Sequence, residues 1–268
     1  GASDAGQTSV VLENRVPQVS DVSIDNTTPY ATETLTCSAT FFDPDGEVLA
    51  VDYEWSIHGT VVGTGATISL ATDMVSPEDV VVCKASVEDG YGAQAEGEAV
   101  ATVVNSSPTM STVSITPDVD VKVTDELLCN ATSTDLNDGV LSGDYTWTNL
   151  STGNVAGEEA ILQLDSSFVS PDDVLECEVV FTDAHGASIS DQASVLLLNS
   201  PPSFEQDVEI EPNTGVYVGT LLTCSAEVVD ADGTVVEVDY SWSVQGQSVG
   251  TGMVYTVLAE DVEVGDSI

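Results

Sequence analysis

The stretch LTCSATFFDPDGEVLAVDYEW, residues 35–55, decides the fold, because the chain carries it three times. The other two copies are LLCNATSTDLNDGVLSGDYTW at 127–147 and LTCSAEVVDADGTVVEVDYSW at 222–242. Cys37, Cys129 and Cys224 are 92 and 95 residues apart, and the three tryptophans repeat the same two intervals. A period of this length indicates a tandem array of similar domains.

Within each copy, short segments of alternating apolar and polar residues are separated by Gly, Pro, Asn and Asp turns, which is typical of a β-sandwich. Frequent Val, Thr, Gly and Asp and only three Met also favour β-structure. Successive strand side chains point to opposite faces, so the apolar set of each strand should face inward. The inward positions are Leu35, Cys37, Ala39, Phe41, Val51, Tyr53, Trp55, Ile57, Val81, Cys83, Ala85 and Val87 in the first copy; Leu127, Cys129, Ala131, Tyr145, Trp147, Leu175, Cys177, Val179 and Phe181 in the second; and Leu222, Cys224, Ala226, Val228, Val238, Tyr240, Trp242 and Val244 in the third.

The order of cysteine, tryptophan and cysteine in the first two copies resembles the immunoglobulin-like superfamily. The resemblance implies strands B, C and F and two disulfides, Cys37–Cys83 and Cys129–Cys177. Val81 and Leu175 stand where antibody-type domains carry a corner tyrosine, which argues against an antigen-receptor lineage. We therefore expect an all-β chain of tandem immunoglobulin-like β-sandwich domains in an extended array.

The DPDG, DxW and NSSP or NSPP elements resemble the bacterial Ig-like and PKD-like repeats of large surface proteins. The resemblance covers nearly the whole chain and carries little information about a ligand. We predict complete domains at 17–106 and 107–203. Residues 1–16 are expected to be the terminal strand of a preceding domain, and 204–268 an incomplete domain without strands F and G. In this register the partner of Cys224 is expected about two residues beyond Ile268.

The sequence is strongly acidic, with 46 Asp and Glu against Arg15, Lys84 and Lys122, a formal net charge of −43. This charge repels phosphate and anionic lipid headgroups, so we expect no nucleic acid partner and no direct membrane insertion. Two explanations stay open: a surface kept soluble by repulsion, or one that collects divalent cations. The widely spaced cysteines favour disulfides in an extracellular or cell-surface location, and the lack of a CxxC pair argues against zinc.

Acidic loops in the B–C and F–G positions are the candidate metal sites, because these loops share the end of a sandwich at which the linkers around Asn105 and Asn199 enter. Ca²⁺ prefers six to eight oxygen ligands, which two acidic loops and a linker carbonyl could supply in part. The alternative is that each Asp-x-Asp-Gly is a turn in which Asp caps its own backbone. The candidate residues are Asp43, Asp45, Asp89, Asp135, Asp138, Asp183, Asp230 and Asp232.

We expect no enzymatic activity, because His58 and His185 occupy non-equivalent positions outside any Ser, Cys or HExxH motif. The favoured function is a non-enzymatic extracellular structural repeat, such as a stalk, filament or adhesin shaft. The alternative is a glycan- or protein-binding module. A carbohydrate platform could draw on four tyrosines outside the C-strand pattern, Tyr30, Tyr91, Tyr217 and Tyr255, but their positions do not repeat and scattered surface aromatics are ordinary.

The expected partners are neighbouring repeats of the same chain or other copies of it. One arrangement for other copies is head to tail, with the segment Gln7 to Leu12 completing the open sheet edge of another copy's third domain by β-strand addition.

Overall fold

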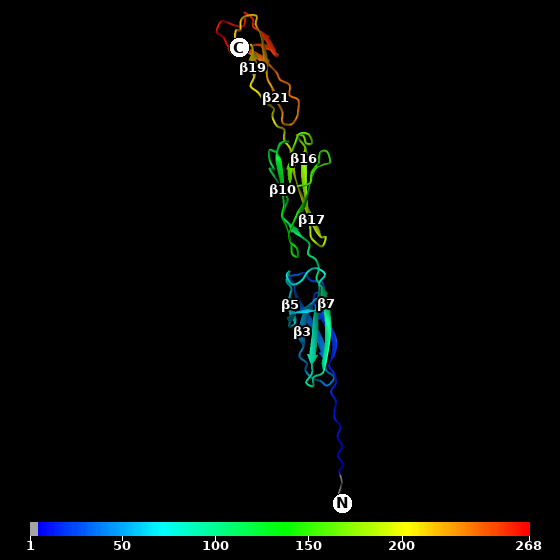
Figure 1. The fold of residues 1–268 in the computed structure, drawn as a ribbon. Helices are drawn as coiled ribbons and strands as arrows, with labels where there is room; N and C mark the ends of the chain where they lie inside the picture. Colours follow the sequence, from blue (N-terminus) through cyan, green and yellow to red (C-terminus); the bar gives the residue numbers. More distant parts are fainter. Residues whose placement is uncertain (1–4) are drawn as a thin grey trace. The chain divides into compact units, whose positions relative to one another are not determined.

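The computed structural model describes residues 5–268, and every regular element in them is a β-strand (Figure 1). The chain is therefore all-β, as predicted. Its strands are β1 Gln18–Ile24, β2 Thr34–Phe42, β3 Asp52–Ile57, β4 Thr60–Thr64, β5 Thr67–Ser69, β6 Val80–Glu88, β7 Gln94–Thr102, β8 Thr109–Met110, β9 Ser114–Thr116, β10 Glu126–Asn130, β11 Ser133–Asp135, β12 Gly139–Leu141, β13 Gly143–Asn149, β14 Asn154–Gly157, β15 Ile161–Gln163, β16 Val174–Thr182, β17 Ser188–Leu196, β18 Ser203–Phe204, β19 Glu209–Glu211, β20 Leu221–Ser225, β21 Val228–Val229, β22 Ser241–Val244, β23 Gln247–Thr251 and β24 Val254–Thr256.

The first repeat is a sandwich of two antiparallel sheets, with strand orders β1-β2-β5 and β4-β3-β6-β7. Period-two alternation is clearest in β6, where the four predicted inward residues are buried and their neighbours are more exposed. The core joins both sheets through Leu35 and Cys37 of β2 and Trp55 of β3. Trp55 is fully buried, and its indole N–H donates to the Gly65 carbonyl at 2.9 Å, so its polar atom is satisfied.

The second repeat contains a four-stranded sheet, β14-β13-β16-β17, and two three-stranded sheets, β15-β10-β9 and β12-β11-β8. The counterpart of β2 is interrupted here, because β10 ends at Asn130 and β11 begins at Ser133. At the interruption, Thr132 accepts a backbone bond from Ser111 and donates its own N–H to the Ser111 hydroxyl. Trp147 is again fully buried, and its indole N–H donates to the Glu159 carbonyl at 2.9 Å.

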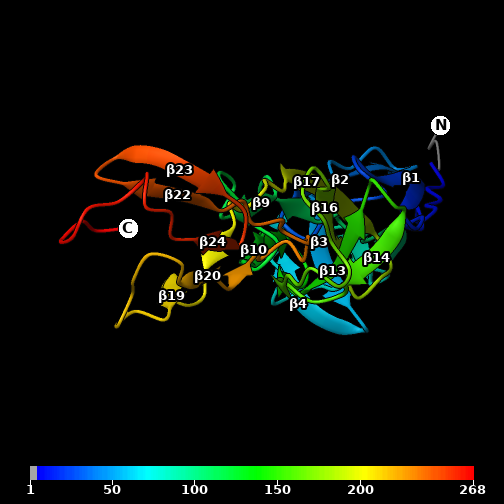
Figure 2. The same ribbon diagram turned by 90° about the horizontal axis from the view of Figure 1, so that it is seen from above.

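The third repeat has sheets of order β18-β21, β19-β20-β24 and β22-β23. Figure 2 shows β22 and β23 side by side, as their antiparallel register requires. In the described residues β22 has one strand neighbour, whereas its counterpart β3 lies between β4 and β6. Trp242 is buried and bonds the Gly252 carbonyl at 2.8 Å. Several predicted inward residues, Cys224 among them, are only partly buried in this repeat.

Two compact units make up the chain. One combines the chain up to Ser111 with residues 132–143 and 181–189, and the other contains 112–131, 144–180 and 190–268. The loop regions of the second repeat thus belong to the same unit as the linker that precedes them. The predicted domain boundaries at 16/17, 106/107 and 203/204 stay predictions.

The predicted terminal strand at 1–16 lies partly outside the described residues, which begin at Ala5. From Ala5 to Pro17 the chain forms no strand, and Val10, Val11 and Leu12 are each more than four-fifths exposed. The predicted addition of this segment to another copy stays a prediction. Among the described residues the structure has no helix with the length and apolar character needed to cross a membrane.

Candidate functional site: the linker anchors

The B–C loops are the first component of the site, and they form the turns that the Asp-x-Asp-Gly pattern indicates. In each loop the first Asp accepts a hydrogen bond from the backbone N–H two residues later. The following glycine has positive φ, +86° at Gly46 and +77° at Gly233, which favours glycine because it has no Cβ. The three bonds are Asp45 N–H to Asp43 Oδ1 (2.6 Å), Asn137 N–H to Asp135 Oδ1 (2.7 Å) and Asp232 N–H to Asp230 Oδ1 (2.8 Å).

The F–G loops of the first two repeats are organised by one buried aspartate each. Oδ1 of Asp89 accepts the N–H groups of Tyr91 and Ala93, both at 2.9 Å. Asp183 makes the same two bonds at 2.9 Å, to the second and fourth residues that follow it. This use of one oxygen fixes each loop and leaves Oδ2 free for a partner outside it.

That partner is an asparagine of the preceding linker. Asn14 Nδ2 donates to Asp89 Oδ2 at 2.9 Å, and Asn105 Nδ2 donates to Asp183 Oδ2 at 2.8 Å. The partners are 75 and 78 residues apart in sequence, so each bond ties the linker to the far loop of the following repeat. Asn199 holds the equivalent linker position, and its amide donates instead to the Ser200 carbonyl at 2.8 Å.

The residue after each asparagine makes a second bond, from its backbone N–H to the B–C loop. Its acceptor is always the second polar residue of that loop. The three bonds are Arg15 N–H to Asp45 Oδ2 (2.7 Å), Ser106 N–H to Asn137 Oδ1 (3.1 Å) and Ser200 N–H to Asp232 Oδ2 (2.6 Å). We call these contacts, together with the asparagine bonds, the linker anchors. The expectation that the acidic loops face the linkers is confirmed.

Side-chain contacts strengthen the first two anchors. The Arg15 guanidinium pairs with Asp45 at 2.8 Å and also donates to the Pro44 carbonyl. In the second anchor the Ser106 hydroxyl lies 2.7 Å from Asn137 Oδ1 and 3.1 Å from Asp135 Oδ2. The linkers are therefore held by direct protein contacts.

The anchors also set the protonation of their aspartates. The Asn14 amide, followed by the loop N–H groups, lowers the pKa of Asp89 against an opposing effect of burial. Asp183 has a lowered pKa for the same reasons, with the Asn105 amide as the largest cause. The Arg15 backbone N–H, and then its side chain, lower the pKa of Asp45. These three carboxylates are thus held in the ionised form that accepts the bonds.

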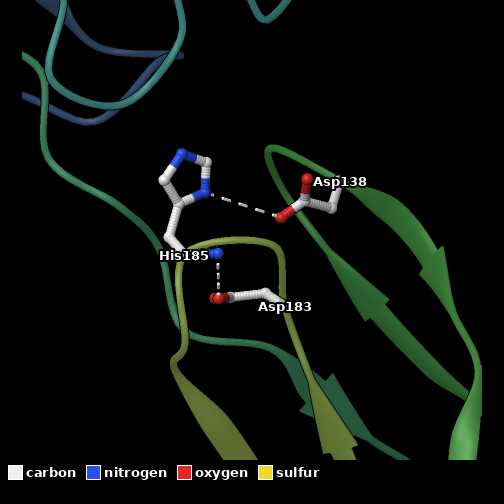
Figure 3. Close-up of side chains that lie close together, drawn as sticks. All are labelled: Asp138, Asp183 and His185. Atoms are coloured by element: carbon white, nitrogen blue, oxygen red, sulfur yellow. Dashed lines mark hydrogen bonds and ion pairs between the residues drawn. The ribbon is translucent and has the colours of Figure 1, made fainter.

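Two groups of metal-ligating side chains lie at these anchors. Asp43, Glu47 and Asp89 offer ligand atoms within 4.8 Å of one another in the first, and Asp138, Asp183 and His185 do so in the second (Figure 3). Glu47 and His185 were missed by sequence reasoning. The metal roles of the eight predicted aspartates stay predictions, and four of them join neither group among the described residues: Asp45, Asp135, Asp230 and Asp232.

Three buried side-chain atoms have no hydrogen-bond partner among the described residues, and each belongs to a different anchor. They are Asp43 Oδ2, Asn105 Oδ1 and Asp232 Oδ1. All three are acceptors. Buried polar groups are normally paired, and each of these three oxygens can accept a donor or coordinate a cation.

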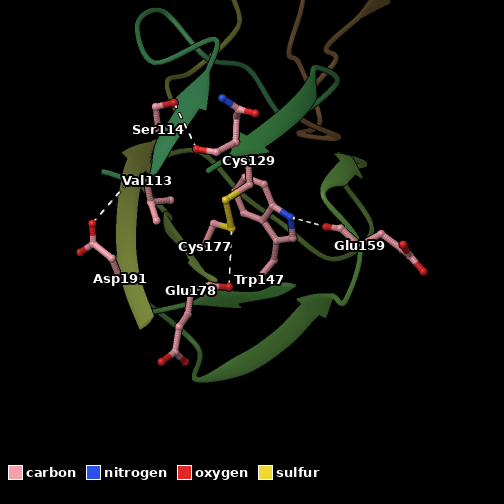
Figure 4. Close-up of a disulfide and its surroundings, with 9 residues drawn as sticks. Val113, Ser114, Cys129, Trp147, Glu159, Cys177, Glu178 and Asp191 are labelled. Carbon is pink, nitrogen blue, oxygen red and sulfur yellow. Dashed lines mark hydrogen bonds between the residues drawn. A yellow bond between two sulfur atoms is a disulfide. The ribbon is translucent and has the colours of Figure 1, made fainter. Parts of the chain in front are cut away.

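The two disulfides implied by the family resemblance are present. Cys37–Cys83 and Cys129–Cys177 join residues 46 and 48 apart, and in both repeats the cysteines are buried. Figure 4 shows the second bridge beside Trp147. Cys224 forms no disulfide with a described residue.

The remaining candidates are separate from the anchors. His58 is an exposed turn residue whose Nε2 lies 2.8 Å from Asp79 Oδ1. The grouping of Tyr255 with three surface tyrosines is wrong, because Tyr255 is 7% exposed, stacks on Trp242 at 5.5 Å between ring centroids and donates to Asp261 at 2.8 Å. The expected absence of catalysis stays a prediction.

No protein-family model and no curated protein matches the chain. Solved structures similar to it include three N-terminal domains of the outer capsid protein Hoc of bacteriophage RB49, at 17% identity over 92% of this chain and 85% of that one, TM-score 0.27. Domains of titin match at 16% identity over 90% and 87%, TM-score 0.36. A Ca²⁺-stabilized adhesin of an Antarctic bacterium that binds ice matches at 14% identity over 93% and 65%, TM-score 0.32. Such similarities concern the fold alone. The PKD-like part of the resemblance stays a prediction.

Proposed function

We propose that the chain is a non-enzymatic structural repeat of an extracellular protein, of the kind that forms a stalk, filament or adhesin shaft. In this proposal each linker is fixed to the loops of the repeat that follows it. The supporting observation is the recurrence of the anchor in register: the backbone N–H after the linker asparagine bonds the B–C loop three times over.

The chemistry of the anchors suits a spacer. Hydrogen bonds to a charged acceptor are shorter and stronger than those between neutral groups, and each linker makes at least one of them. These bonds restrict the rotation of the chain at the junction. Repeated contacts of this kind would restrict the rotation of the chain in a similar way at every junction between repeats. That property is useful in a rod and is not needed in a catalyst.

The extracellular location rests on the two disulfides, which persist in oxidising compartments. Each closes a loop of nearly fifty residues and would stabilise its domain by about 4 kcal/mol in the chain-entropy model. The net charge of −43 is consistent with a surface that repels other anionic chains and stays soluble.

The proposal includes calcium at the anchors, with the first as the best supported site. Asp43 and Asp89 are buried carboxylates, Glu47 is half-buried beside them, and Asp43 Oδ2 has no partner among the described residues. A set made only of carboxylate oxygens is the type that Ca²⁺ prefers. By repeat register the sites of the other two junctions would draw on Asp135, Asp138 and Asp183, and on Asp230 and Asp232.

The anchor is tested by Asn105→Ala in the full chain, with Asn130→Ala as the matched control. Asn130 is an exposed asparagine of the second repeat, at the end of β10, whose side chain bonds no described residue. Backbone ¹⁵N relaxation should show larger nanosecond motion at residues 105–107 in Asn105→Ala and no change in the control. Equal order parameters at residues 105–107 in the two variants would contradict the proposal that the Asn105 amide fixes the linker.

Calcium is tested separately by titrating the native chain and following its thermal unfolding. Binding should raise the melting temperature, and Asp43→Asn should reduce the rise. An unchanged melting temperature in the native chain would remove calcium from the proposal and leave the direct anchor standing.

A further inference from the structure

The second anchor contains an imidazole beside its carboxylates, whereas the metal-ligating group of the first anchor contains carboxylates alone. His185 follows Asp183 in the F–G loop at the place held by Tyr91 after Asp89. Asp138 is the additional acidic residue of a B–C turn that has five residues from its first Asp to its Gly, against four in the other repeats. The two side chains meet across the loops, with His185 Nδ1 at 3.9 Å from Asp138 Oδ2 (Figure 3).

We propose that Asp138, Asp183 and His185 bind a borderline transition-metal cation of the Zn²⁺ class. This inference rests on the proposed role of the anchors as cation sites and assigns a different metal to one of them. Imidazole nitrogen favours Zn²⁺, Cu²⁺ and Ni²⁺, whereas carboxylate and carbonyl oxygens alone favour Ca²⁺ and Mg²⁺. The first and second anchors would then select different ions in one chain.

The geometry is close to that of a tetrahedral site. Zn–N and Zn–O bonds of about 2.1 Å place two ligand atoms about 3.4 Å apart. The imidazole nitrogen and the Asp138 oxygen are 3.9 Å apart, and the three ligand atoms lie within 4.8 Å of one another. A side-chain movement on the order of 1 Å would bring all three to bonding distance.

Free lone pairs remain on the ligands. A carboxylate has about four acceptor positions. Asp183 uses two on Oδ1 for loop N–H groups and one on Oδ2 for the Asn105 amide, so one position on Oδ2 remains. Among the described residues the one hydrogen bond that Asp138 Oδ2 accepts is from the Ala184 N–H, at 3.3 Å, so a metal need not displace the bonds that shape the loops.

A separate observation concerns the asparagine of the same anchor. The Asn105 amide that donates to Asp183 carries its oxygen, Oδ1, in a buried position without a partner among the described residues. An amide oxygen is a metal ligand or a partner for a metal-bound water. This oxygen belongs to the amide whose nitrogen donates to Asp183, one of the three proposed ligands.

The local charge also favours a cation. At the first anchor Arg15 neutralises Asp45, but no equivalent arginine exists here, because Ser106 follows Asn105. The other basic residues of the sequence, Lys84 and Lys122, pair with Glu96 and Asp120. His185 is therefore the sole basic side chain that the described residues place at this anchor. Sequence reasoning argued against zinc from cysteine spacing, and this set contains no cysteine.

The test is calorimetric titration of the full chain with Zn²⁺ in excess Ca²⁺, which occupies sites made only of carboxylates. Three variants are compared: His185→Tyr, which installs the residue of the first anchor; Asp138→Asn; and His58→Tyr, which removes the other histidine. Loss of one ligand should weaken zinc binding at least about tenfold in the first two. His58→Tyr should bind within twofold of the native chain.

Direct evidence comes from the imidazole resonances of the native chain, where Zn²⁺ should shift those of His185 and leave those of His58 in place. Zinc affinity that is unchanged by His185→Tyr, or reduced equally by His58→Tyr, would overturn the inference. Calcium binding without zinc binding would contradict this inference alone, whereas binding of neither ion would remove cations from the proposed function as well.

Discussion

Removing the Cys129–Cys177 disulfide should destabilise the second repeat and leave the first repeat as stable as before. Cys129 and Cys177 are buried and close a loop of 48 residues. In the chain-entropy model this closure contributes about 4 kcal/mol, because the unfolded chain loses conformations when its ends are joined. The double variant Cys129→Ala and Cys177→Ala removes the bridge without burying an unpaired hydroxyl.

Native-state hydrogen exchange measures the effect repeat by repeat. A loss of about 4 kcal/mol corresponds to exchange about a thousandfold faster, since each 1.4 kcal/mol is a factor of ten. We expect that acceleration in β16 of the second repeat and unchanged protection in β6 of the first. The reasoning fails if β16 stays within tenfold of the native rate, and independence of the repeats fails if β6 accelerates to the same degree.

Three further predictions concern packing and protonation. Trp147→Phe should cost about 1–3 kcal/mol in chemical unfolding, because it leaves the Glu159 carbonyl unpaired and a cavity beside the disulfide; equal stability would contradict that role. Gly97→Ala should cost about 1–3 kcal/mol, because a Cβ there would lie 2.7 Å from Val22 Cγ2, whereas Gly6→Ala, with no heavy atom within 4 Å, should be neutral. The pKa of Asp183 is lower in the folded chain than its ordinary value of 3.8. The contribution of the Asp183 carboxylate to folding stability is therefore fully present above pH 3.8 and is lost as the pH falls through the lower folded value. Exchange at the Ala187 amide, which donates to Asp183 Oδ1, should accelerate in that acidic range and stay level from pH 5 to 8 after correction for its intrinsic pH dependence.

The fold and its cores could be predicted from the sequence because their signals are periodic. A tryptophan and a cysteine that return in one register mark the same buried positions in every repeat, and β6 is long enough for its alternation to be unambiguous. Tyr255 was misassigned because β24 has only three residues, too few to establish a face. A carbohydrate platform that includes Tyr255 is thus excluded by its burial.

The anchors could be predicted only in outline. Acidic loops were expected at the linker end, but the bond from Asn105 to Asp183 joins two polar residues 78 positions apart and leaves no local pattern. The signal that was available is the recurrence of asparagine before each Pro-containing linker. Glu47 and His185 differ between repeats, so repeat comparison alone does not identify them.

The measurement that tests the central claim most directly is amide exchange at Arg15, Ser106 and Ser200 in the native chain near neutral pH. Anchoring in register predicts protection at all three, each well above that of Val16 and Ser107, whose N–H groups bond no described residue. Exchange of the three amides at the rate of their unbonded neighbours would contradict the account, because the linkers would then not be held by the loops.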